Sequence, residues 1–388
     1  MAAPLPPEHD TNLAWFHGFV NWQLLIEGDF TKVRTLQNAI HGKVIQYEYT
    51  EERLDVAGKK MSSASVDRYK RRDDKPTNDM WAHRSLGVTS PEDALTEIGV
   101  LSFLRAQPDV PQFLIRMIGA FRNDDTSILV TDFVQGGDLF TQVATGQLVA
   151  DEPMLMTIMW QLISAVKYLH EHAIGHRDIS LENVLINRQP DRGIHITLMD
   201  FGQAVRTHSE PHVPFRYFRQ AGKPYYKGPE CYVSPAEQVH VLVPDGAHAG
   251  EVVFAEIYQN GRPNGYLNEV RLMEGAVGGQ VCLAEPWGYQ AAPLDVFAMG
   301  VCFFIVATGK PPWSTALPLD QTFAYVQRHG IPALLRAWRR LPLSDEAADL
   351  LSRMVAADPS ARCSAHGCLA HVWLQGFAGQ AVPTHPPA

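Results

Sequence analysis

Short runs in which apolar and polar side chains roughly alternate dominate the first third of the chain. Three of them cover residues 30–36, 42–50 and 54–61, and two more apolar runs cover 113–122 and 126–134. Alternation with a period of two is typical of half-buried β-strands, and turn-forming residues separate several of these runs. The pattern therefore predicts five antiparallel strands.

Apolar residues take up helical spacing further along the chain. Residues 154–173 predict a helix that is buried on most sides. Ser90, Pro91 and an acidic residue come before the apolar run up to about Ala106, and together they predict a helix start. Residues 13–28 predict a short helix that packs on the body, and the polar residues 62–88 predict an exposed loop.

Strands thus come before helices, with a boundary near residues 134–137. This order predicts an α+β protein of two domains rather than a βαβ repeat. We expect an N-terminal extension at 1–28, a first lobe at 29–134, a second at 135–378, and a tail at 379–388. A boundary between two domains is the default place for a ligand site.

Composition narrows the classes of function. The chain has 388 residues and a net charge of −9, which argues against a general nucleic-acid binder. Five scattered cysteines do not form a disulfide framework, so a cytoplasmic, or else nuclear, location is expected. We expect neither a signal peptide nor a membrane span, because no uncharged apolar run approaches about 18 residues.

Ordered motifs in the middle of the chain carry the candidate chemistry. His-Arg-Asp at 176–178 is followed by Asn183, then Asp-Phe-Gly at 200–202 and Gly-Pro-Glu at 228–230. The first two sets match H-R-D-x-x-x-x-N and D-F-G, and Gly-Pro-Glu stands where A-P-E belongs, so the chain resembles the protein kinase superfamily over roughly residues 30–375. One tripeptide alone is weak evidence, whereas the ordered set is specific.

The resemblance implies a bilobal kinase fold: a five-stranded antiparallel N-lobe sheet with one helix, and a mainly helical C-lobe. It also implies that Asp178 orients the substrate hydroxyl, while Asn183 and Asp200 hold Mg²⁺ against the phosphates of ATP. Phosphoryl transfer needs an aligned hydroxyl and cations that neutralise spreading charge, and these residue types supply both.

Two registers compete for the lysine that binds the α- and β-phosphates. In one, residues 28–33 form the glycine-rich loop and Tyr47 takes the lysine position, which would make a pseudokinase. In the other, residues 36–44 form the loop and Lys59 follows at the family's usual spacing. We favour the second register, in which Glu97 is the helix glutamate that pairs with Lys59.

The second register assigns a nucleotide pocket by position in the family. The residues expected to contact ATP are Gly42, Val44, Ala57, Lys59, Thr131, Asp132, Val134, Asp138 and Leu185. Val44 and Ala57 would cover the adenine from above and Leu185 from below. Backbone groups of Asp132 and Val134 would bind its edge, and Asp138 would reach the ribose. Thr131 falls at the gatekeeper position.

The chain departs from the family pattern in its glycine-rich loop. Gln37 and Ala39 occupy the first two glycine positions, and Gly42 is the one that remains. Glycine lets backbone N–H groups approach phosphate closely. We therefore expect a higher KM for ATP, or reduced activity.

A second departure concerns two facing positions. Ser180 stands where serine/threonine kinases usually have a lysine, and Lys223 stands where they usually have a threonine. We hypothesise an exchange in which Lys223 supplies the ammonium group and Ser180 the hydroxyl, so that positive charge still reaches the transferring phosphoryl group. The alternative is drift in an inactive protein.

Arg177 is typical of kinases whose activation segment is ordered by phosphorylation. Near the usual phosphosite, however, stands Arg219, and Thr207, Ser209 and Tyr217 are the neighbouring alternatives. We expect no phosphate switch at the usual place.

Glu182 precedes the catalytic-loop asparagine, as in serine/threonine enzymes, and with Asp138 it hints at basic protein substrates. We expect Asp295 to bind the catalytic-loop backbone and Glu230 to pair with Arg362. Residues 236–286 are an insertion with strand-like pieces and an Asn-Gly turn, which is either a docking or regulatory element or a passive hairpin.

The sequence therefore predicts a protein kinase, expected to be a monomer, that moves the γ-phosphate of ATP to serine or threonine hydroxyls of proteins. The alternative is a pseudokinase, a binding or scaffold module of the same fold. A small-molecule kinase is disfavoured by the complete activation segment.

Overall fold

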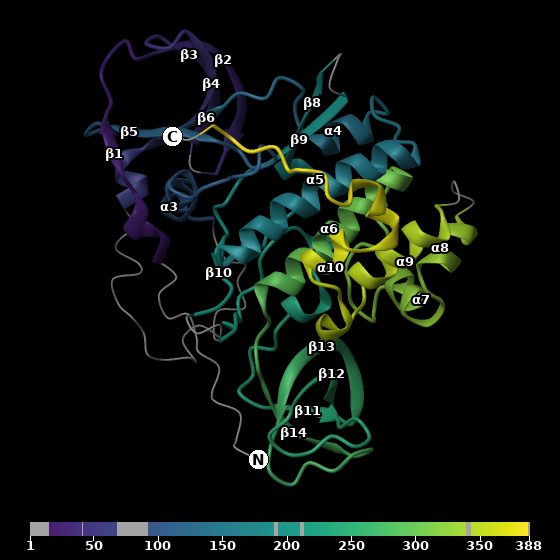
Figure 1. Cartoon of the computed structure of the whole chain (residues 1–388). Coiled ribbons are helices and arrows are strands. Elements are labelled where there is room, and N and C mark those ends of the chain that lie inside the picture. The colour runs from purple at the N-terminus through teal and green to yellow at the C-terminus, as the bar shows by residue number, and fades with distance from the viewer. Residues whose placement is uncertain are drawn as a thin grey trace.

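The computed structural model describes residues 15–40, 42–67, 92–189, 193–209, 213–338 and 343–386. They form two lobes, one built on a sheet and one mainly helical, and a small barrel projects from the helical lobe (Figure 1). The predicted α+β class and its two-lobed arrangement are confirmed. Most of the expected loop at 62–88 lies outside the described residues.

A six-stranded sheet forms the N-lobe, in the order β1-β5-β6-β4-β3-β2. Its strands are β1 (Trp22–Leu24), β2 (Phe30–Ala39), β3 (Gly42–Tyr49), β4 (Leu54–Ser62), β5 (Met117–Arg122) and β6 (Thr126–Asp132). The five predicted strands are antiparallel, as expected, but β1 adds a sixth that runs parallel to β5. A five-stranded sheet would have left the polar backbone edge of β5 unpaired.

The helix predicted over residues 13–28 was therefore only partly right. Within the described residues, the segment forms the 3-10 helix η1 (Trp15–Phe19) and then strand β1. Phe16 is buried against helix α3 (Ala94–Arg105), and a side chain at Gly99 would collide with the Phe16 carbonyl. The absence of a side chain at Gly99 thus allows η1 to lie directly on α3.

The predicted start of α3 at Ser90 and Pro91 was wrong. The N-cap is Asp93, whose carboxylate accepts a hydrogen bond from the Leu95 N–H at 2.9 Å. Asp is as good a cap as Ser, and Asp93 also contacts the imidazole of His17, which lies far away in the sequence. Ser90 and Pro91 themselves lie outside the described residues.

The C-lobe is mainly helical. Its helices are α4 (Leu139–Ala144), α5 (Glu152–Glu171), α6 (Ala291–Thr308), α7 (Gln321–His329), α8 (Ile331–Ala337), α9 (Asp345–Met354) and α10 (Ala365–Leu369). The helix predicted at 154–173 corresponds to α5. Short 3-10 helices accompany them: η2 (Leu181–Asn183), η3 (Pro224–Tyr226), η4 (Pro229–Cys231), η5 (Pro359–Ala361) and η6 (Val372–Phe377).

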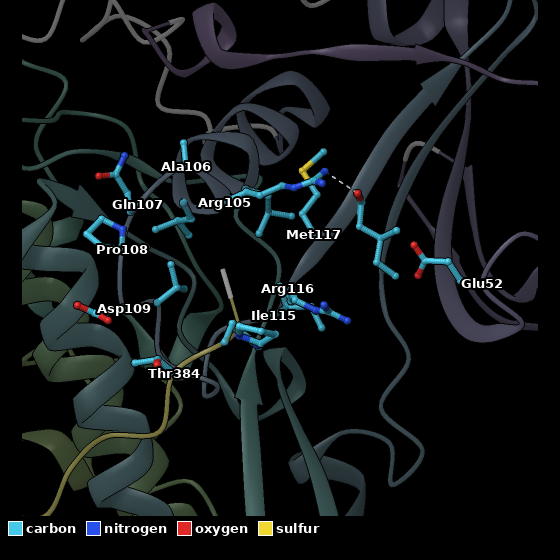
Figure 2. Close-up of a pocket in the computed structure, with 16 residues that line it drawn as sticks. Glu52, Arg105, Ala106, Gln107, Pro108, Asp109, Ile115, Arg116, Met117 and Thr384 are labelled. Carbon is cyan, nitrogen blue, oxygen red and sulfur yellow. Dashed lines mark hydrogen bonds between the residues drawn. The ribbon is translucent and has the colours of Figure 1, made fainter. Parts of the chain in front are cut away.

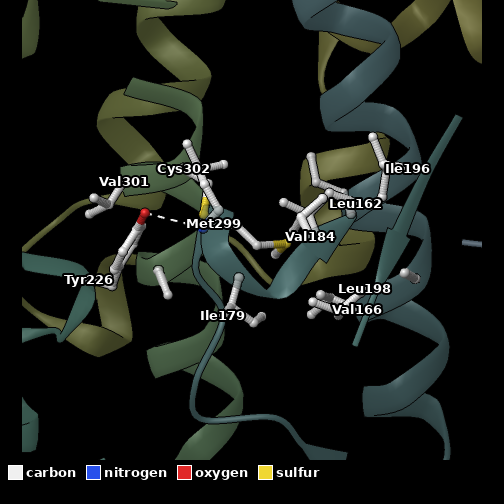
Figure 3. Close-up of a cluster of buried hydrophobic side chains, with 14 of the residues drawn as sticks. Leu162, Val166, Ile179, Val184, Ile196, Leu198, Tyr226, Met299, Val301 and Cys302 are labelled. Atoms are coloured by element: carbon white, nitrogen blue, oxygen red, sulfur yellow. Dashed lines mark hydrogen bonds between the residues drawn. The ribbon is translucent and has the colours of Figure 1, made fainter. Parts of the chain in front are cut away.

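The core of the C-lobe supports the central loop. Two small antiparallel sheets lie on it: a hairpin of β8 (Val184–Gln189) with β9 (Gly193–Leu198), and a pairing of the distant strands β7 (Ile174–Gly175) and β10 (Val205–Arg206). Figure 3 shows Val166 of α5 and Met299 of α6 packed around Ile179, which belongs to the loop between β7 and η2. The loop is therefore anchored by buried apolar contacts on both sides.

Among the described helices, α6 is the one that is long and apolar enough to cross a membrane by length and composition. It is mostly buried inside the fold, as expected of a core helix. Asp295 lies within it and is fully buried.

The insertion folds into a closed four-stranded barrel of β11 (Val239–Leu242), β12 (Val252–Gln259), β13 (Arg262–Leu272) and β14 (Val281–Pro286). It has its own small core of aliphatic side chains. The predicted turn is present: Asn260 and Gly261 have φ angles of 52° and 74°, as a tight turn between paired strands requires. Closure into a barrel was not predicted from the sequence.

The C-terminal tail returns to the N-lobe, as the yellow trace in Figure 1 shows. The Gln112 N–H donates to the Pro383 carbonyl at 2.8 Å, and the His385 N–H donates to the Val110 carbonyl at 2.8 Å. Thr384 and the end of α3 line a cavity of about 680 Å³ (Figure 2). None of the residues predicted to contact ATP lines this cavity.

Candidate active site

Lys59 and Glu97 are brought together from two elements of the N-lobe. Strand β4 carries Lys59 and helix α3 carries Glu97, and Lys59 Nζ donates to Glu97 Oε2 at 2.7 Å. Only 12% and 9% of the two side chains are exposed, so the pair is largely shielded from water. Tyr47, the residue of the competing register, pairs with Val56 and so lies on the opposite face of the sheet from Lys59.

The charge of Lys59 is held by its neighbours. Burial lowers the pKa of its ammonium group, but the carboxylates of Glu97 and Asp200 raise that pKa by more, and the net shift is upward. Asp200, which follows β9 in the C-lobe, therefore faces Lys59 across the two lobes. An ammonium that stays protonated is suited to binding phosphate.

The loop that contains Asp178 is held by a buried carboxylate. Asp295 of α6 accepts hydrogen bonds from the His176 N–H at 2.8 Å and the Arg177 N–H at 2.7 Å. This contact, expected from the sequence, is confirmed. Asn183 then donates through Nδ2 to the Asp178 carbonyl at 2.7 Å and to its Oδ2 at 2.9 Å.

Lys223 reaches the same carboxylate from the activation segment. Its Nζ donates to Ser180 Oγ at 2.8 Å and lies 3.3 Å from Asp178 Oδ2. Ser180 is fully buried, while a third of the Lys223 side chain remains exposed. Burial raises the pKa of Asp178, and the ammonium of Lys223 acts against that rise.

The structure offers oxygen donors that fit Mg²⁺. Because Asn183 Nδ2 is occupied by Asp178, the amide oxygen of Asn183 remains for a cation. Asp200 Oδ1 accepts a hydrogen bond from the Gly202 N–H at 3.3 Å, so the other carboxylate oxygen of Asp200 can bind a cation. The described residues contain no cluster of three or more His, Cys, Asp or Glu side chains for a metal. Two protein oxygens completed by phosphates and water are, however, what Mg²⁺ sites typically use.

The residues predicted to cover the adenine come from both lobes. Strand register places Val44 opposite Lys59 and Ala57 opposite Thr131. Leu185 forms an isolated β-bridge with Asp138, at the start of the C-lobe. A side chain at Gly42 would collide with the Lys60 carbonyl, so the first position of β3 requires glycine.

The hinge and ribose candidates already have side-chain partners. Both Asp132 carboxylate oxygens accept hydrogen bonds from Arg116, between 2.8 and 3.2 Å. Asp138 caps α4, accepting from the Thr141 N–H at 2.7 Å and its hydroxyl at 2.8 Å. Val134 packs against the main core. For Asp132 and Val134 the prediction concerned backbone groups. The Asp132 N–H donates to the Arg116 carbonyl at 3.1 Å, and the Asp132 carbonyl accepts from the Thr131 hydroxyl at 3.4 Å, so the Asp132 backbone already has partners.

Glu92 is a site residue that the sequence analysis missed. Its Cβ lies 3.3 Å from where a Cβ on Gly202 would stand, so it borders the Asp-Phe-Gly segment. Burial and the nearby Asp200 carboxylate raise its pKa to about 7. In the sequence Glu92 appeared only as an acidic residue at a helix start, and no motif marks it.

Comparisons with known proteins agree with this geometry. A family model described as "Protein kinase domain" matches residues 41–242 and 284–374. It leaves residues 243–283, most of the barrel, outside the match. The fold and site thus define a bilobal protein kinase architecture, and because the match exceeds half of the chain, the chain belongs to the protein kinase family.

Curated relatives are serine/threonine-protein kinases. The chain is 27% identical to DCLK3 of Homo sapiens over 263 residues, which are 68% of this chain and 31% of that protein. It is 26% identical to SBK1 of Danio rerio over 275 residues, 69% of this chain and 56% of that protein. It is 27% identical to ULK3 of Homo sapiens over 294 residues, 76% of this chain and 48% of that protein. The chain thus spans about half, or less, of the length of these relatives.

Proposed function

We propose that this protein is an active serine/threonine protein kinase that uses Mg·ATP and phosphorylates protein substrates. The observation that carries the proposal is the convergence of the Lys59–Glu97 pair with Asp178, Lys223 and Asp200. These side chains come from β4, α3, the catalytic loop and the activation segment, which are separate parts of the two lobes. Two ammonium groups beside these carboxylates suit a site that binds phosphate groups and stabilises charge on them.

Each group has a defined task in this proposal. Asp178 orients the substrate hydroxyl and accepts its proton, and Lys59 binds the α- and β-phosphates. Asn183 and Asp200 hold Mg²⁺, which supplies positive charge at the phosphates. Lys223 brings its ammonium to the phosphoryl group that moves, where charge spreads in the transition state.

A direct assay tests the proposal. The protein, incubated with Mg²⁺ and [γ-³²P]ATP, is expected to label a basic protein substrate, and phosphoamino-acid analysis is expected to yield phosphoserine or phosphothreonine. Asp178→Asn should abolish transfer while the thermal shift on adding Mg·ATP persists. Transfer that survives Asp178→Asn would contradict the assigned role.

The class of substrate is tested by peptides with and without arginine. Basic substrates were expected from Asp138 and Glu182, but Asp138 caps α4 and Glu182 accepts from the Tyr226 hydroxyl at 3.1 Å. Faster phosphorylation of the arginine-containing peptides would indicate that Asp138 and Glu182 leave their present partners and bind the arginines when a substrate binds. Equal rates of phosphorylation for the two kinds of peptide would contradict the expectation of basic substrates.

The second candidate is an ATP-binding module without transfer activity. Gln37 and Ala39 lie in strand β2 where glycines would approach phosphate, and Glu92 adds a carboxylate beside Asp200. In that case Mg·ATP would raise the melting temperature, Lys59→Met would remove the effect, and no substrate would be labelled.

A further inference from the structure

The environment of Arg177 differs from that of an arginine that awaits a phosphate. Its side chain is buried, and Nε donates to the Gln203 carbonyl at 2.8 Å. Nη1 donates to the Tyr289 hydroxyl at 3.1 Å, and the guanidinium lies 5.1 Å from the Tyr217 ring centre. The cation is thus held by a carbonyl, a phenol and an aromatic face.

Tyr289 links Arg177 to the activation segment. Its hydroxyl accepts from Arg177 and donates to the Arg219 carbonyl at 2.6 Å. A phosphate in an activation segment orders it by accepting hydrogen bonds from buried arginines. The fully buried Tyr289 makes the same connection from outside the segment, because it lies just after the barrel.

The hydroxyls of the activation segment are poorly placed to receive phosphate. Between Asp200 and Glu230 the sequence contains five: Thr207, Ser209, Tyr217, Tyr225 and Tyr226. All of them except Tyr225 are buried. Tyr225 is half-buried, and its hydroxyl lies 3.5 Å from a Glu182 carboxylate oxygen. Addition of a phosphate to the four buried hydroxyls would require the segment to open first.

Backbone hydrogen bonds join the segment to the residues after the barrel. Tyr217 and Tyr289 exchange two of them, each 2.9 Å long. Gly288, between the barrel and Tyr289, has a φ of 73°, and a Cβ there would lie 2.8 Å from the Tyr217 carbonyl. The close approach therefore depends on glycine at this position.

A shielded ion pair ties the barrel itself to the segment. Arg216 Nη1 lies 2.7 Å from Glu269 Oε1 of β13, and only 11% and 12% of these side chains are exposed. On the same strand, Asn268 binds the chain just after the segment: it donates to the Tyr232 carbonyl at 3.0 Å and accepts from the Ser234 N–H at 2.8 Å. The barrel thus contacts the chain on both sides of the Gly-Pro-Glu motif.

We propose that the barrel, together with the residues that directly follow it, is a built-in clamp that keeps the activation segment ordered without phosphorylation. Tyr289 takes the place of a phosphate toward Arg177, and Glu269 anchors Arg216. Both are positioning residues, since neither contacts the reacting groups. The expected effect on kcat rests on the proposed kinase activity. The expected effect on hydrogen exchange in the segment does not.

The test uses full-length protein treated with phosphatase and shown by intact mass to carry no phosphate. Hydrogen exchange should be slow at the amides of Tyr217 and Tyr289 in this form. Glu269→Gln and Tyr289→Phe should each speed exchange there by about 10-fold or more. Each should also lower kcat about 10-fold with little change in the KM for ATP.

Glu256→Gln is the matched control, because it removes one carboxylate from β12 of the same barrel without a contact to the activation segment among the described residues. It should leave exchange and kcat unchanged. Circular dichroism and melting temperature will establish that each variant is folded.

Three results would overturn the clamp. They are rapid exchange at Tyr217 in the phosphate-free protein, a gain of more than about 10-fold in kcat on phosphorylation of the segment, or equal behaviour of Glu269→Gln and Glu256→Gln. The two proposals can fail separately. If neither wild type nor variant transfers phosphate, the proposed kinase activity is wrong. The clamp is still supported in that case if hydrogen exchange in the segment is slow in the wild type and faster in Glu269→Gln.

Discussion

At the scale of single residues, the position of a charge matters more than the residue that carries it. Lys223 Nζ lies within hydrogen-bond distance of Ser180 and 3.3 Å from Asp178, although it comes from the activation segment rather than the catalytic loop. Electrostatic stabilisation depends on where the ammonium ends, because the transferring group responds to the field at its own position. Lys223 Nζ thus lies where the exchange hypothesis requires it, and the exchange of roles itself stays a prediction.

Restoring the usual arrangement tests this exchange. Lys223→Thr should lower kcat by about 100-fold, the scale on which one transition-state donor acts, with little change in the KM for ATP. Adding Ser180→Lys should recover at least a tenth of the original kcat. Lys310→Ala removes an exposed lysine of the C-lobe and serves as the control. No recovery in the double variant, or near-normal kcat in Lys223→Thr, would contradict the exchange.

Glu92 makes stability depend on pH. Its pKa is about 7 in the folded protein, against 4.5 for an ordinary glutamate, so the folded state binds its proton more tightly. This contribution to stability is fully present below about pH 4.5, is lost as pH rises toward 7, and does not change above that. Partial exposure limits the effect to about 1 kcal/mol.

Glu92→Gln should therefore raise the free energy of unfolding at pH 8 by about 1 kcal/mol, and have little effect at pH 4.5. Urea unfolding at several pH values measures this difference. Glu274→Gln, at an exposed position of the barrel region, should follow the wild type throughout. If the difference in the free energy of unfolding between Glu92→Gln and wild type is the same at every pH from 4.5 to 8, the raised pKa of Glu92 is contradicted.

At the scale of elements, the β2–β3 hairpin decides how closely backbone groups can approach a nucleotide. Strand pairing continues to the end of β2, with Gln37 opposite Val44 and Ala39 opposite Gly42. The backbone of a paired strand is less free to turn its N–H groups toward phosphate than a glycine-rich loop is. This pairing is the physical reason for expecting a higher KM for ATP, or reduced activity, and that expectation stays a prediction.

Gln37→Gly combined with Ala39→Gly should lower the KM for ATP by about 3- to 10-fold, because glycines permit a phosphate-binding turn. Steady-state kinetics at saturating protein substrate measures the change. Thr31→Gly combined with Val33→Gly places two glycines at exposed positions of the same strand and should leave the KM unchanged. Equal KM values for the two double variants would show that the loop does not limit ATP binding.

At the scale of the whole molecule, buried ion pairs join segments that are distant in sequence. Glu230 and Arg362 form a two-pronged pair in which both side chains are fully buried, and Arg362 Nη2 lies 2.8 Å from Glu230 Oε2. The expected pair is therefore present, and it connects η4 to η5. The barrel follows η4, so this pair also fixes the base from which the barrel projects.

Arg362→Ala should lower the free energy of unfolding by about 3–5 kcal/mol, because Glu230 would be left as a buried charge without its partner. Urea denaturation measures the loss. Arg353→Ala breaks an exposed pair with Asp349 on α9 and should change stability by no more than about 0.5 kcal/mol. A loss below about 1 kcal/mol in Arg362→Ala would mean that water or another cation replaces the guanidinium.

Local patterns were enough to predict much of this protein. The spacing of Asp178, Asn183 and Asp200 predicted the family, which is confirmed, and the alternating runs predicted five of the six N-lobe strands. Such features depend on residues that are close together in the chain, because backbone periodicity and motif spacing are local.

Contacts between distant segments decided the rest. Strand β1 forms because the edge of β5 needs partners, Asp93 caps α3 with His17 beside it, and the insertion closes into a barrel around its own core. The burial of Glu92 beside Asp200 and the contact of Tyr289 with Arg177 arise in the same way. Their energies come from desolvation and from partners that fold into place, neither of which a single segment of sequence contains.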